Sequence, residues 1–266
     1  MNIEGLILDI DGVISRGRKP IERAIEGYRI IKELGIKTVF VSNNSTRSRR
    51  IMLERFKHFG VDVGEDELII ATHATAVHIA KENGSTKIYT TGEDGLKEEL
   101  LNLDHEIVDY RNADYLVVGS NRGINFEIFT KALRLALDRE VRYVAVNPDR
   151  VFPAEDGPIP GTGLIIGALY WMTGREPDVI VGKPSKIIVD QAIERLNVDR
   201  ERIAIVGDQI DVDIMAGKNA GIKSILVMSG VTNQENYQEK VRQVGVAPDF
   251  VFEDLYELAV ALSSGK

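Results

Sequence analysis

Four short polar motifs in this sequence each directly follow a short apolar run, and each carries side chains suited to phosphate or metal chemistry. They lie at residues 9–12 (DIDG), 42–46 (SNNST), 182–185 (GKPS) and 207–213 (GDQIDVD). Carboxylates, hydroxyls, amides and a lysine are the groups that bind a phosphate together with a divalent cation. The motifs therefore predict a site for a phosphorylated ligand, provided that the fold brings them together.

The first motif contains two carboxylates, Asp9 and Asp11, at the end of the apolar segment 3–10, and Gly12 turns the chain there. A buried pair of carboxylates costs free energy unless a cation or other partners compensate for it. Such a pair also arises by chance, as at Asp211 and Asp213. The alternative interpretation is a polar strand end that caps a turn.

The second motif begins with Ser42 and Asn43 and continues with Asn44. Hydroxyl and amide groups at a strand end, just before a helix, form an uncharged donor set for a phosphate, and Asn44 is expected to support that set. The same residues are also good N-caps for the helix that follows. The two interpretations are compatible with each other.

The third motif carries Lys183, which supplies the focused positive charge that a protein of net charge -8 needs to bind a phosphate. It is not the lysine of a Walker A loop, because Pro177 stands where that loop requires a glycine. Most lysines are exposed on loops, and that is the alternative here. The position after an apolar segment favours a functional lysine.

The fourth motif carries Asp208 and Asp213 after the apolar segment 202–206. Hard oxygen ligands of this kind suit Mg²⁺, which takes one or two carboxylates, keeps several waters and binds substrate phosphate. The alternative is an acidic helix N-terminus, where the helix dipole favours aspartate. The motif predicts a magnesium site.

The elements that must position these motifs alternate between short β-type apolar runs and longer helical patterns. Strands are expected at 3–10, 36–41, 179–181, 202–206 and 224–227, and helices at 21–34, 48–59, 71–82, 187–196 and 210–219. This alternation predicts an α/β fold with a Rossmann-like, mainly parallel sheet. Ligands bind at the carboxyl ends of the strands in such sheets, which is where the motifs lie.

The middle of the chain has a βαβ pattern of its own, with strands at 87–91, 115–118 and 143–146 and helices at 94–101 and 126–137. Residues 79–176 are therefore expected to form a smaller α/β domain inserted into a core made of residues 1–78 and 177–266. No motif of the core offers contacts for a leaving group. Substrate specificity is therefore expected in the inserted domain.

Composition excludes several classes of function. The 266 residues include no cysteine, which rules out thiol catalysis, disulfides and cysteine zinc sites. The acidic net charge argues against nucleic-acid partners. The segment after Met1 is not expected to be a signal peptide, and the longest apolar run, 164–172, is far shorter than the roughly 20 residues that span a bilayer. We expect a cytoplasmic protein with no membrane partner. Abundant Ile, Lys, Arg and Glu favour a thermophilic source.

Taken together in this order, the four motifs resemble those of the haloacid dehalogenase-like (HAD) hydrolase superfamily: D-x-D-G-V, then S/T-N-N, then a lone Lys, then G-D-x-x-x-x-D. The segment 147–163 (NPDRVFPAEDGPIPGTG) followed by VGKPS resembles the subfamily with a large α/β cap, which includes the NagD-like phosphatases, the 4-nitrophenylphosphatases and the phosphoglycolate phosphatases. The segment 118–122 (VGSNR) departs from the pattern, since Asn121 stands where relatives carry a carboxylate.

The resemblance implies a Mg²⁺-dependent phosphatase that forms an aspartyl-phosphate intermediate. Asp9 would be the nucleophile, and Asp11 the general acid and then the general base. Asp208 would bind Mg²⁺ alongside Asp9 and the backbone carbonyl of Asp11, with Asp213 in support. Lys183 would offset the charge between Asp9 and the phosphoryl group.

The resemblance also implies that Ser42 and Asn43 hold phosphate oxygens. It places the loop 147–163 over the active site, with Phe152 and Pro153 beside the leaving group, and it implies a homodimer formed through the cap. The alternative for Phe152 is packing inside the cap.

Other functions remain open at this stage. A receiver domain also combines acids, a hydroxyl and a lysine with Mg²⁺, but no inserted domain is expected there. A phosphomutase or phosphotransferase would use the same residues. The substrate is a small phosphorylated metabolite, and phosphoglycolate, sugar phosphates, glycerol phosphate, nucleoside monophosphates and aryl phosphates all remain candidates.

Overall fold

The computed structural model describes residues 1–152 and 157–265. The chain forms two compact units. Unit 1 comprises Met1–Ser42, Leu53–Ile69 and Lys183–Lys266, and unit 2 comprises Asn43–Met52 and Ile70–Gly182. Within the described ranges, no helix is long and apolar enough to cross a membrane.

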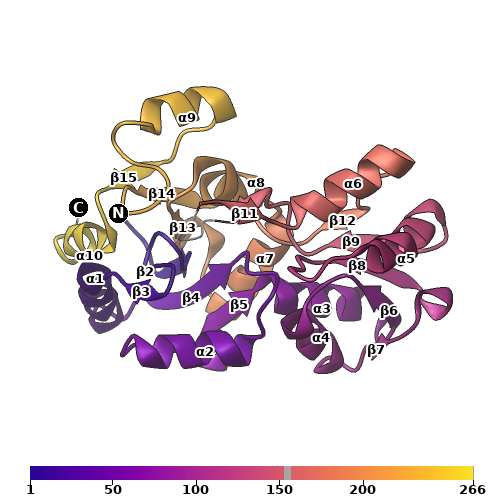
Figure 1. The fold of residues 1–266 in the computed structure, drawn as a ribbon. Coiled ribbons are helices and arrows are strands. Elements are labelled where there is room, and N and C mark those ends of the chain that lie inside the picture. Colours follow the sequence, from indigo (N-terminus) through magenta and orange to yellow (C-terminus); the bar gives the residue numbers. More distant parts are fainter. Residues whose placement is uncertain (153–156, 266) are drawn as a thin grey trace. The chain divides into compact units, whose positions relative to one another are not determined.

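Unit 1 is built on a six-stranded sheet with the order β15-β14-β13-β1-β4-β5 (Figure 1). The central strand β1 pairs in parallel with β13 and β4, and β14 pairs in parallel with both β13 and β15. The strands are β1 (Gly5–Leu8), β4 (Lys37–Ser42), β5 (Leu68–Ile70), β13 (Ile203–Gly207), β14 (Lys223–Val227) and β15 (Phe250–Phe252). The predicted Rossmann-like α/β fold is confirmed.

Helices follow the strands of unit 1. They are α1 (Glu22–Glu33), α2 (Arg49–His58), α7 (Lys186–Leu196), α8 (Met215–Ala220), α9 (Tyr237–Val244) and α10 (Leu255–Ser263). The first turn of α2 is part of unit 2. Every residue of β1 and β13 is buried, as expected of parallel strands that are covered on both faces. A row of buried aromatic rings, with Phe40 4.6 Å from Phe56 between ring centroids, joins β4 to α2.

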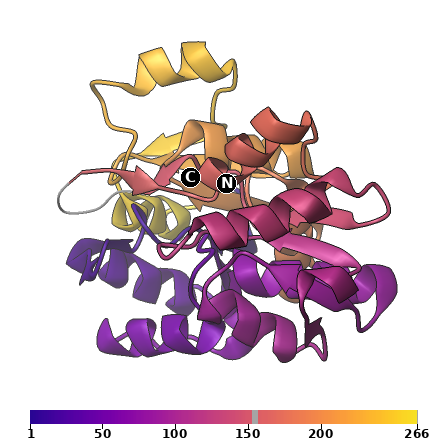
Figure 2. The same cartoon turned by 45° about the vertical axis from the view of Figure 1, so that its right-hand side comes forward.

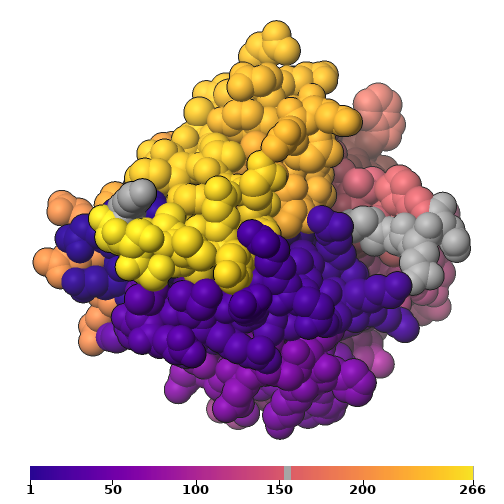
Figure 3. All heavy atoms as spheres, turned by 90° about the vertical axis from the view of Figure 1, so that its left-hand side faces the viewer, coloured from indigo at the N-terminus to yellow at the C-terminus, as the bar shows by residue number. Residues whose placement is uncertain are grey.

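The two ends of the chain pack together in unit 1. Helix α10 lies against α1, and Figure 3 shows the yellow C-terminal part lying on the indigo N-terminal part. Gly27 permits this contact, because a Cβ atom at that position would lie 2.7 Å from the backbone of Tyr256. Gly35, with φ of 74°, ends the turn that follows α1.

Unit 2 has a second parallel sheet with the order β12-β9-β8-β6-β7, whose strands are labelled in Figure 1 and turned by 45° in Figure 2. Its strands are β6 (Lys87–Thr90), β7 (Glu106–Ile107), β8 (Tyr115–Val118), β9 (Arg142–Ala145) and β12 (Val179–Ile180), and its helices are α3 (Ala71–Asn83), α4 (Asp94–Leu101), α5 (Phe126–Leu137) and α6 (Gly163–Thr173). Leu116, Tyr143 and Ile165 belong to its own apolar core. Unit 2 is therefore a self-contained α/β layer structure.

Two sequence predictions differ from the structure. The strand expected at 179–181 was assigned to the core sheet, but β12 pairs in parallel with β9 of unit 2. Residues 43–52 and 70–78 were likewise predicted to belong to the core, yet both segments belong to unit 2, where α3 packs on α4. The apolar character of a short strand does not reveal which of two parallel sheets it joins, and this is the physical reason for the difference.

The helix expected at 210–219 begins with a π-helical turn, Ile210–Ile214, before α8 continues it. The backbone amide of Ile214 donates to the carbonyl of Gln209 at 3.2 Å, while the Asp213 carboxylate accepts from the amide of Gln209 at 3.0 Å. The Asp213 carboxylate therefore bonds back to Gln209 at the start of the turn and helps to hold the wider backbone turn. Single π-turns of this kind occur frequently at functional sites.

Candidate active site

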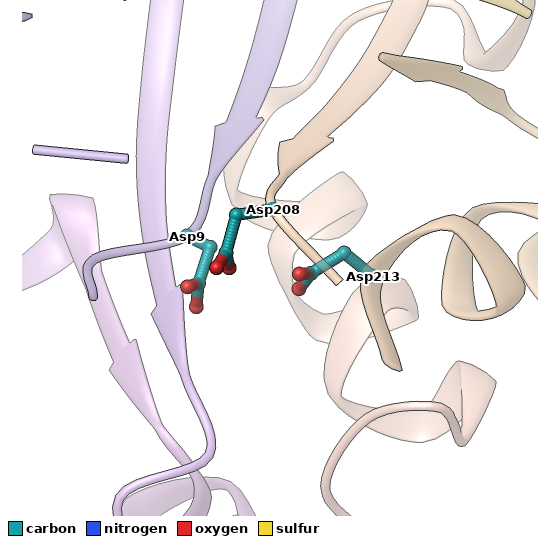
Figure 4. A group of neighbouring side chains, drawn as sticks. All are labelled: Asp9, Asp208 and Asp213. Atoms are coloured by element: carbon teal, nitrogen blue, oxygen red, sulfur yellow. The ribbon is translucent and has the colours of Figure 1, made fainter. Parts of the chain in front are cut away.

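Asp9 and Asp208 lie at the carboxyl ends of neighbouring strands in unit 1. The register pairs Leu8 of β1 with Val206 of β13, and the amide of Asp9 continues the ladder by donating to the carbonyl of Val206 at 2.9 Å. The two acids thus emerge side by side, and Figure 4 shows both carboxylates on the same side of the strand ends. This edge is where ligands bind in open parallel sheets.

Asp213 completes the cluster from the π-helical turn, and its carboxylate points back toward Asp208 (Figure 4). One carboxylate oxygen from each of the three aspartates lies within 4.8 Å of the others. Gly207 makes the close approach possible, since a Cβ atom there would lie 2.1 Å from Cγ of Asp213. All three side chains are buried, which is costly for carboxylates that lack compensating charge.

Lys183 supplies part of that charge. Its Nζ lies 2.6 Å from Oδ1 of Asp9 and 2.5 Å from Oδ1 of Asp213, and only 2% of its side chain is exposed. Burial by itself lowers the pKa of the lysine, but the carboxylates of Asp213 and Asp9 raise it above its ordinary value. Lys183 therefore stays protonated and bridges two of the three acids.

Asp208 differs from its neighbours because it does not contact the lysine ammonium through a hydrogen bond. Its Oδ2 accepts from the amide of Val231 at 2.6 Å, and its Oδ1 is buried without a hydrogen-bond partner among the described residues. Gly12 (φ 90°) and Gly230 crowd this side chain so closely that a Cβ atom at either would collide with it. An unsatisfied carboxylate oxygen in a buried acidic cluster is a fitting ligand for a hard divalent cation.

The charge state of the cluster reflects its burial. Burial, with Asp213 and Asp208 nearby, raises the pKa of Asp9 well above its ordinary value despite the opposing effect of Lys183. Burial and the neighbouring Asp213 raise the pKa of Asp208 to about 7. A bound cation would reverse these shifts, because it favours the ionised carboxylates.

Asp11 does not share this environment. Its side chain is 48% exposed, and its Oδ1 accepts hydrogen bonds from Arg55 at 2.8 Å and from the hydroxyl of Ser15 at 3.3 Å. Arg55 was not predicted from the sequence, because one arginine among several in a helical segment carries no motif. The role of the Asp11 backbone carbonyl as a metal ligand stays a prediction.

The second motif is divided between the two units. Ser42 is the buried last residue of β4, two residues beyond Phe40, which pairs with Leu8 in β1. Asn43 belongs to unit 2, where its amide nitrogen donates to Oδ1 of Asp149 at 2.9 Å. The side chain of Asn147 donates to the carbonyl of Asn43. Asn43 is therefore fixed by side chains of the segment 147–163.

Asn44 forms a local turn, since its Oδ1 accepts from the amides of Thr46 at 3.1 Å and Arg47 at 2.8 Å. The prediction that the second motif caps the following helix is only partly confirmed. The amide of Arg49, the first residue of α2, donates to the carboxylate of Glu99 at 2.6 Å instead.

The remaining predicted residues lie in unit 2. Phe152 belongs to the short strand β10 (Val151–Phe152), pairs with Ile159 of β11 (Ile159–Pro160) and is half-buried. Pro153 lies outside the described residues. Asn121 donates to the carbonyl of Thr91 at 2.7 Å and accepts from the amide of Gly123 at 2.7 Å, so its amide is satisfied within unit 2.

Comparisons with known proteins agree with this arrangement. Residues 6–106 match the profile described as haloacid dehalogenase-like hydrolase, and residues 180–258 match a second HAD-hydrolase-like profile. The chain is 34% identical over 254 residues to the 5′-nucleotidase YutF of Bacillus subtilis, covering 94% of this chain and 96% of the relative. It is 33% identical over 254 residues to an acid sugar phosphatase of Staphylococcus haemolyticus, covering 96% and 94% respectively.

A solved structure, the p-nitrophenyl phosphatase from Archaeoglobus fulgidus, is 58% identical and superimposes with a TM-score of 0.95 over 98% of this chain and 100% of that one. The chain belongs to the haloacid dehalogenase-like hydrolase family. The family and the enzyme class that the motifs predicted, a hydrolase, are thereby confirmed.

The raised pKa of Asp208 predicts how the cluster binds a cation. A ligating carboxylate must lose its proton, so we expect the affinity for Mg²⁺ to fall by about tenfold or more between about pH 8 and about pH 6. Isothermal titration calorimetry of the metal-free protein measures the Mg²⁺ affinity at each pH. Proton release appears as a dependence of the binding enthalpy on the buffer.

Asp208→Asn should bind Mg²⁺ much more weakly than the unmodified protein. Asp211→Asn changes an exposed acid of the same turn and should bind Mg²⁺ with the affinity of the unmodified protein. Equal affinity at both pH values, or equal damage in the two variants, would show that Asp208 does not bind the cation.

Proposed function

We propose that this chain is a Mg²⁺-dependent phosphatase that hydrolyses a small phosphomonoester through an aspartyl-phosphate on Asp9. The observation that carries the proposal is the buried cluster of Asp9, Asp208 and Asp213 bridged by Lys183 at one edge of a parallel sheet. The names of the related proteins, phosphatases and a 5′-nucleotidase, support the same reaction class.

The chemistry requires an anionic carboxylate to approach an anionic phosphate. Lys183 lowers the repulsion, because its ammonium contacts the Asp9 carboxylate at 2.6 Å in a buried environment. Mg²⁺, held by Asp9, Asp208 and the backbone carbonyl of Asp11, would supply the further positive charge that offsets the phosphoryl group. Covalent catalysis then divides one hard displacement into two easier ones.

In the first step, an oxygen of Asp9 bonds to phosphorus while the bond from phosphorus to the leaving oxygen breaks, and Asp11 gives that oxygen a proton. In the second step, Asp11 takes a proton from water as the water oxygen bonds to phosphorus. The bond between phosphorus and Asp9 breaks, which restores the Asp9 carboxylate and releases phosphate. Ser42 and Asn43 would hold phosphate oxygens through their hydroxyl and amide groups.

The direct test replaces the nucleophile. Asp9→Asn keeps the shape of the side chain but removes its charge, so release of phosphate should fall on the order of a thousandfold or more, while the fold survives. Phosphate release with multiple turnovers and circular dichroism provide the two readouts. A folded Asp9→Asn protein that retains substantial activity contradicts the covalent mechanism.

Specificity is proposed to lie in unit 2, and especially in the segment 147–163. Unit 2 has its own sheet and core, and the hydrogen bonds from Asn43 to Asp149 and from Asn147 to Asn43 tie this segment to the second motif. Phe152 is the large apolar side chain of that segment and is proposed to contact the leaving group. The relatives' names include nucleotides, sugar phosphates and nitrophenyl phosphate, so sugar phosphates, phosphoglycolate, nucleotides and aryl phosphates are all candidates.

Phe152→Ala should change the ranking of a panel of phosphate esters and raise KM for the preferred one, while p-nitrophenyl phosphate is still hydrolysed. Val151→Ala is the matched control, because neighbouring residues of a strand point to opposite faces and Val151 is exposed. If Phe152→Ala keeps the ranking and only lowers the melting temperature, Phe152 packs within unit 2 and does not contact substrate.

A homodimer through unit 2 is the proposed assembly. Trp171 of α6 and Phe126 of α5 are 88% and 89% exposed, and Tyr170 and Met172 are exposed beside Trp171. Large exposed apolar groups on packed helices are typical of interaction surfaces.

Light scattering should report a dimer that Trp171→Glu dissociates and that Leu101→Glu, an exposed change on α4, leaves intact. A monomer in the unmodified protein contradicts the proposal.

Cytoplasmic location and a thermophilic source stay predictions from the sequence.

A further inference from the structure

We propose that Arg55 is a positioning residue that orients the side chain of Asp11 for proton transfer to the leaving oxygen. The inference rests on the proposed function, in which Asp11 is the general acid. Arg55 belongs to α2, far along the chain from the first motif, and its side chain is only 13% exposed. No sequence motif includes it.

Arg55 and Ser15 both contact the same oxygen of Asp11. Its Nη2 lies 2.8 Å from Oδ1 of Asp11 and 2.6 Å from Oγ of Ser15, and it also donates to the carbonyl of Gly17. Oγ of Ser15 lies 3.3 Å from the same Oδ1. With Oδ1 engaged by two donors, the other oxygen of Asp11 is left to carry the proton that is transferred.

The guanidinium group is itself held in place by rigid structure. The neighbouring Phe56 is buried against Phe40, which fixes α2 on the sheet. The guanidinium also lies 5.3 Å from the ring centroid of Phe59, within the range of a cation–π contact. Its direction toward Asp11 is therefore set by the core of unit 1, as a group that orients a reacting carboxyl requires.

A second role for Arg55 must be separated from the first. Ser15 and Gly17 belong to the hairpin of β2 (Ser15–Arg16) and β3 (Lys19–Pro20), so Arg55 also anchors that hairpin to α2. Arg16 anchors the same hairpin from another side, because its Nε donates to the carbonyl of Ser229 at 2.9 Å. Among the described residues, the hydrogen bonds to the Asp11 side chain come from Arg55 and Ser15 and not from Arg16, which makes Arg16 a matched control for anchoring alone.

The leaving group distinguishes the two roles. An alkyl alkoxide is a poor leaving group and needs a proton from Asp11, whereas p-nitrophenolate leaves without one. Arg55→Ala should therefore lower kcat/KM, which reports the first step, for an alkyl phosphate about tenfold or more beyond its effect on p-nitrophenyl phosphate. Arg55→Lys should restore part of the difference, since it keeps the charge but loses the planar guanidinium.

Combination with Asp11→Asn tests whether Arg55 acts through Asp11. Asp11→Asn alone should show the same selective loss in kcat/KM, and Arg55→Ala should add nothing to the alkyl-to-aryl ratio of kcat/KM in the Asp11→Asn background. Arg16→Ala and Lys57→Ala, an exposed change on α2, should alter both substrates alike or neither. Circular dichroism and melting temperatures check that each variant folds, and Arg55→Lys serves if Arg55→Ala does not.

Equal losses for the alkyl and aryl substrates in Arg55→Ala, or a further loss of the ratio in the double variant, would overturn the inference and leave Arg55 as a hairpin anchor. The proposed function fails differently: the unmodified protein would then release no phosphate from either ester, or Asp9→Asn would keep its activity.

Discussion

The ammonium of Lys183 between two buried carboxylates is the interaction on which the rest of the site depends. Three aspartates lie together with almost no access to water, and carboxylates in that setting are stable only where positive charge compensates for them. Lys183 contacts Asp9 and Asp213, while Oδ1 of Asp208 has no hydrogen-bond partner among the residues that the structure describes. One positive charge for three acids leaves a deficit that a divalent cation fits. The same imbalance that makes the cluster costly therefore suits it to binding a cation.

The backbone of unit 1 is shaped to allow this density of charge. Parallel pairing of β1 and β13 brings Asp9 and Asp208 side by side, and the π-helical turn returns Asp213 to them. Residues 12, 207 and 230 are glycines, because a Cβ atom at any of these positions would collide with the acids. In the proposed mechanism, Arg55 acts outside this cluster and orients the exposed side chain of Asp11 for proton transfer. The proposed mechanism assigns cation binding and nucleophilic attack to the buried acids and proton transfer to the exposed one.

Much of the catalytic cluster could be predicted from the sequence because its residues follow apolar strands, and strand ends meet at one edge of a parallel sheet. Asp9 and Asp208 are of this kind. Arg55 could not be predicted, since its partner lies 44 positions away and a helix offers several arginines of equal standing. The sequence also did not predict that β12 belongs to the second sheet, because strands of both parallel sheets are made of the same kinds of apolar residues. The identity of the leaving group depends on tertiary contacts that no local pattern encodes.

The central claim, that Asp9 attacks phosphorus, can be measured directly in a variant in which the second step is slow. Asp11→Asn lacks the base that activates water, so a phosphorylated enzyme should accumulate when it is mixed with p-nitrophenyl phosphate and Mg²⁺ and then quenched in acid. Peptide mass spectrometry should find one phosphoryl group on Asp9, and an Asp9→Asn, Asp11→Asn double variant should show none. A phosphoryl group on any other residue, or a burst of p-nitrophenolate with Asp9 unmodified under the same quench, would contradict the account.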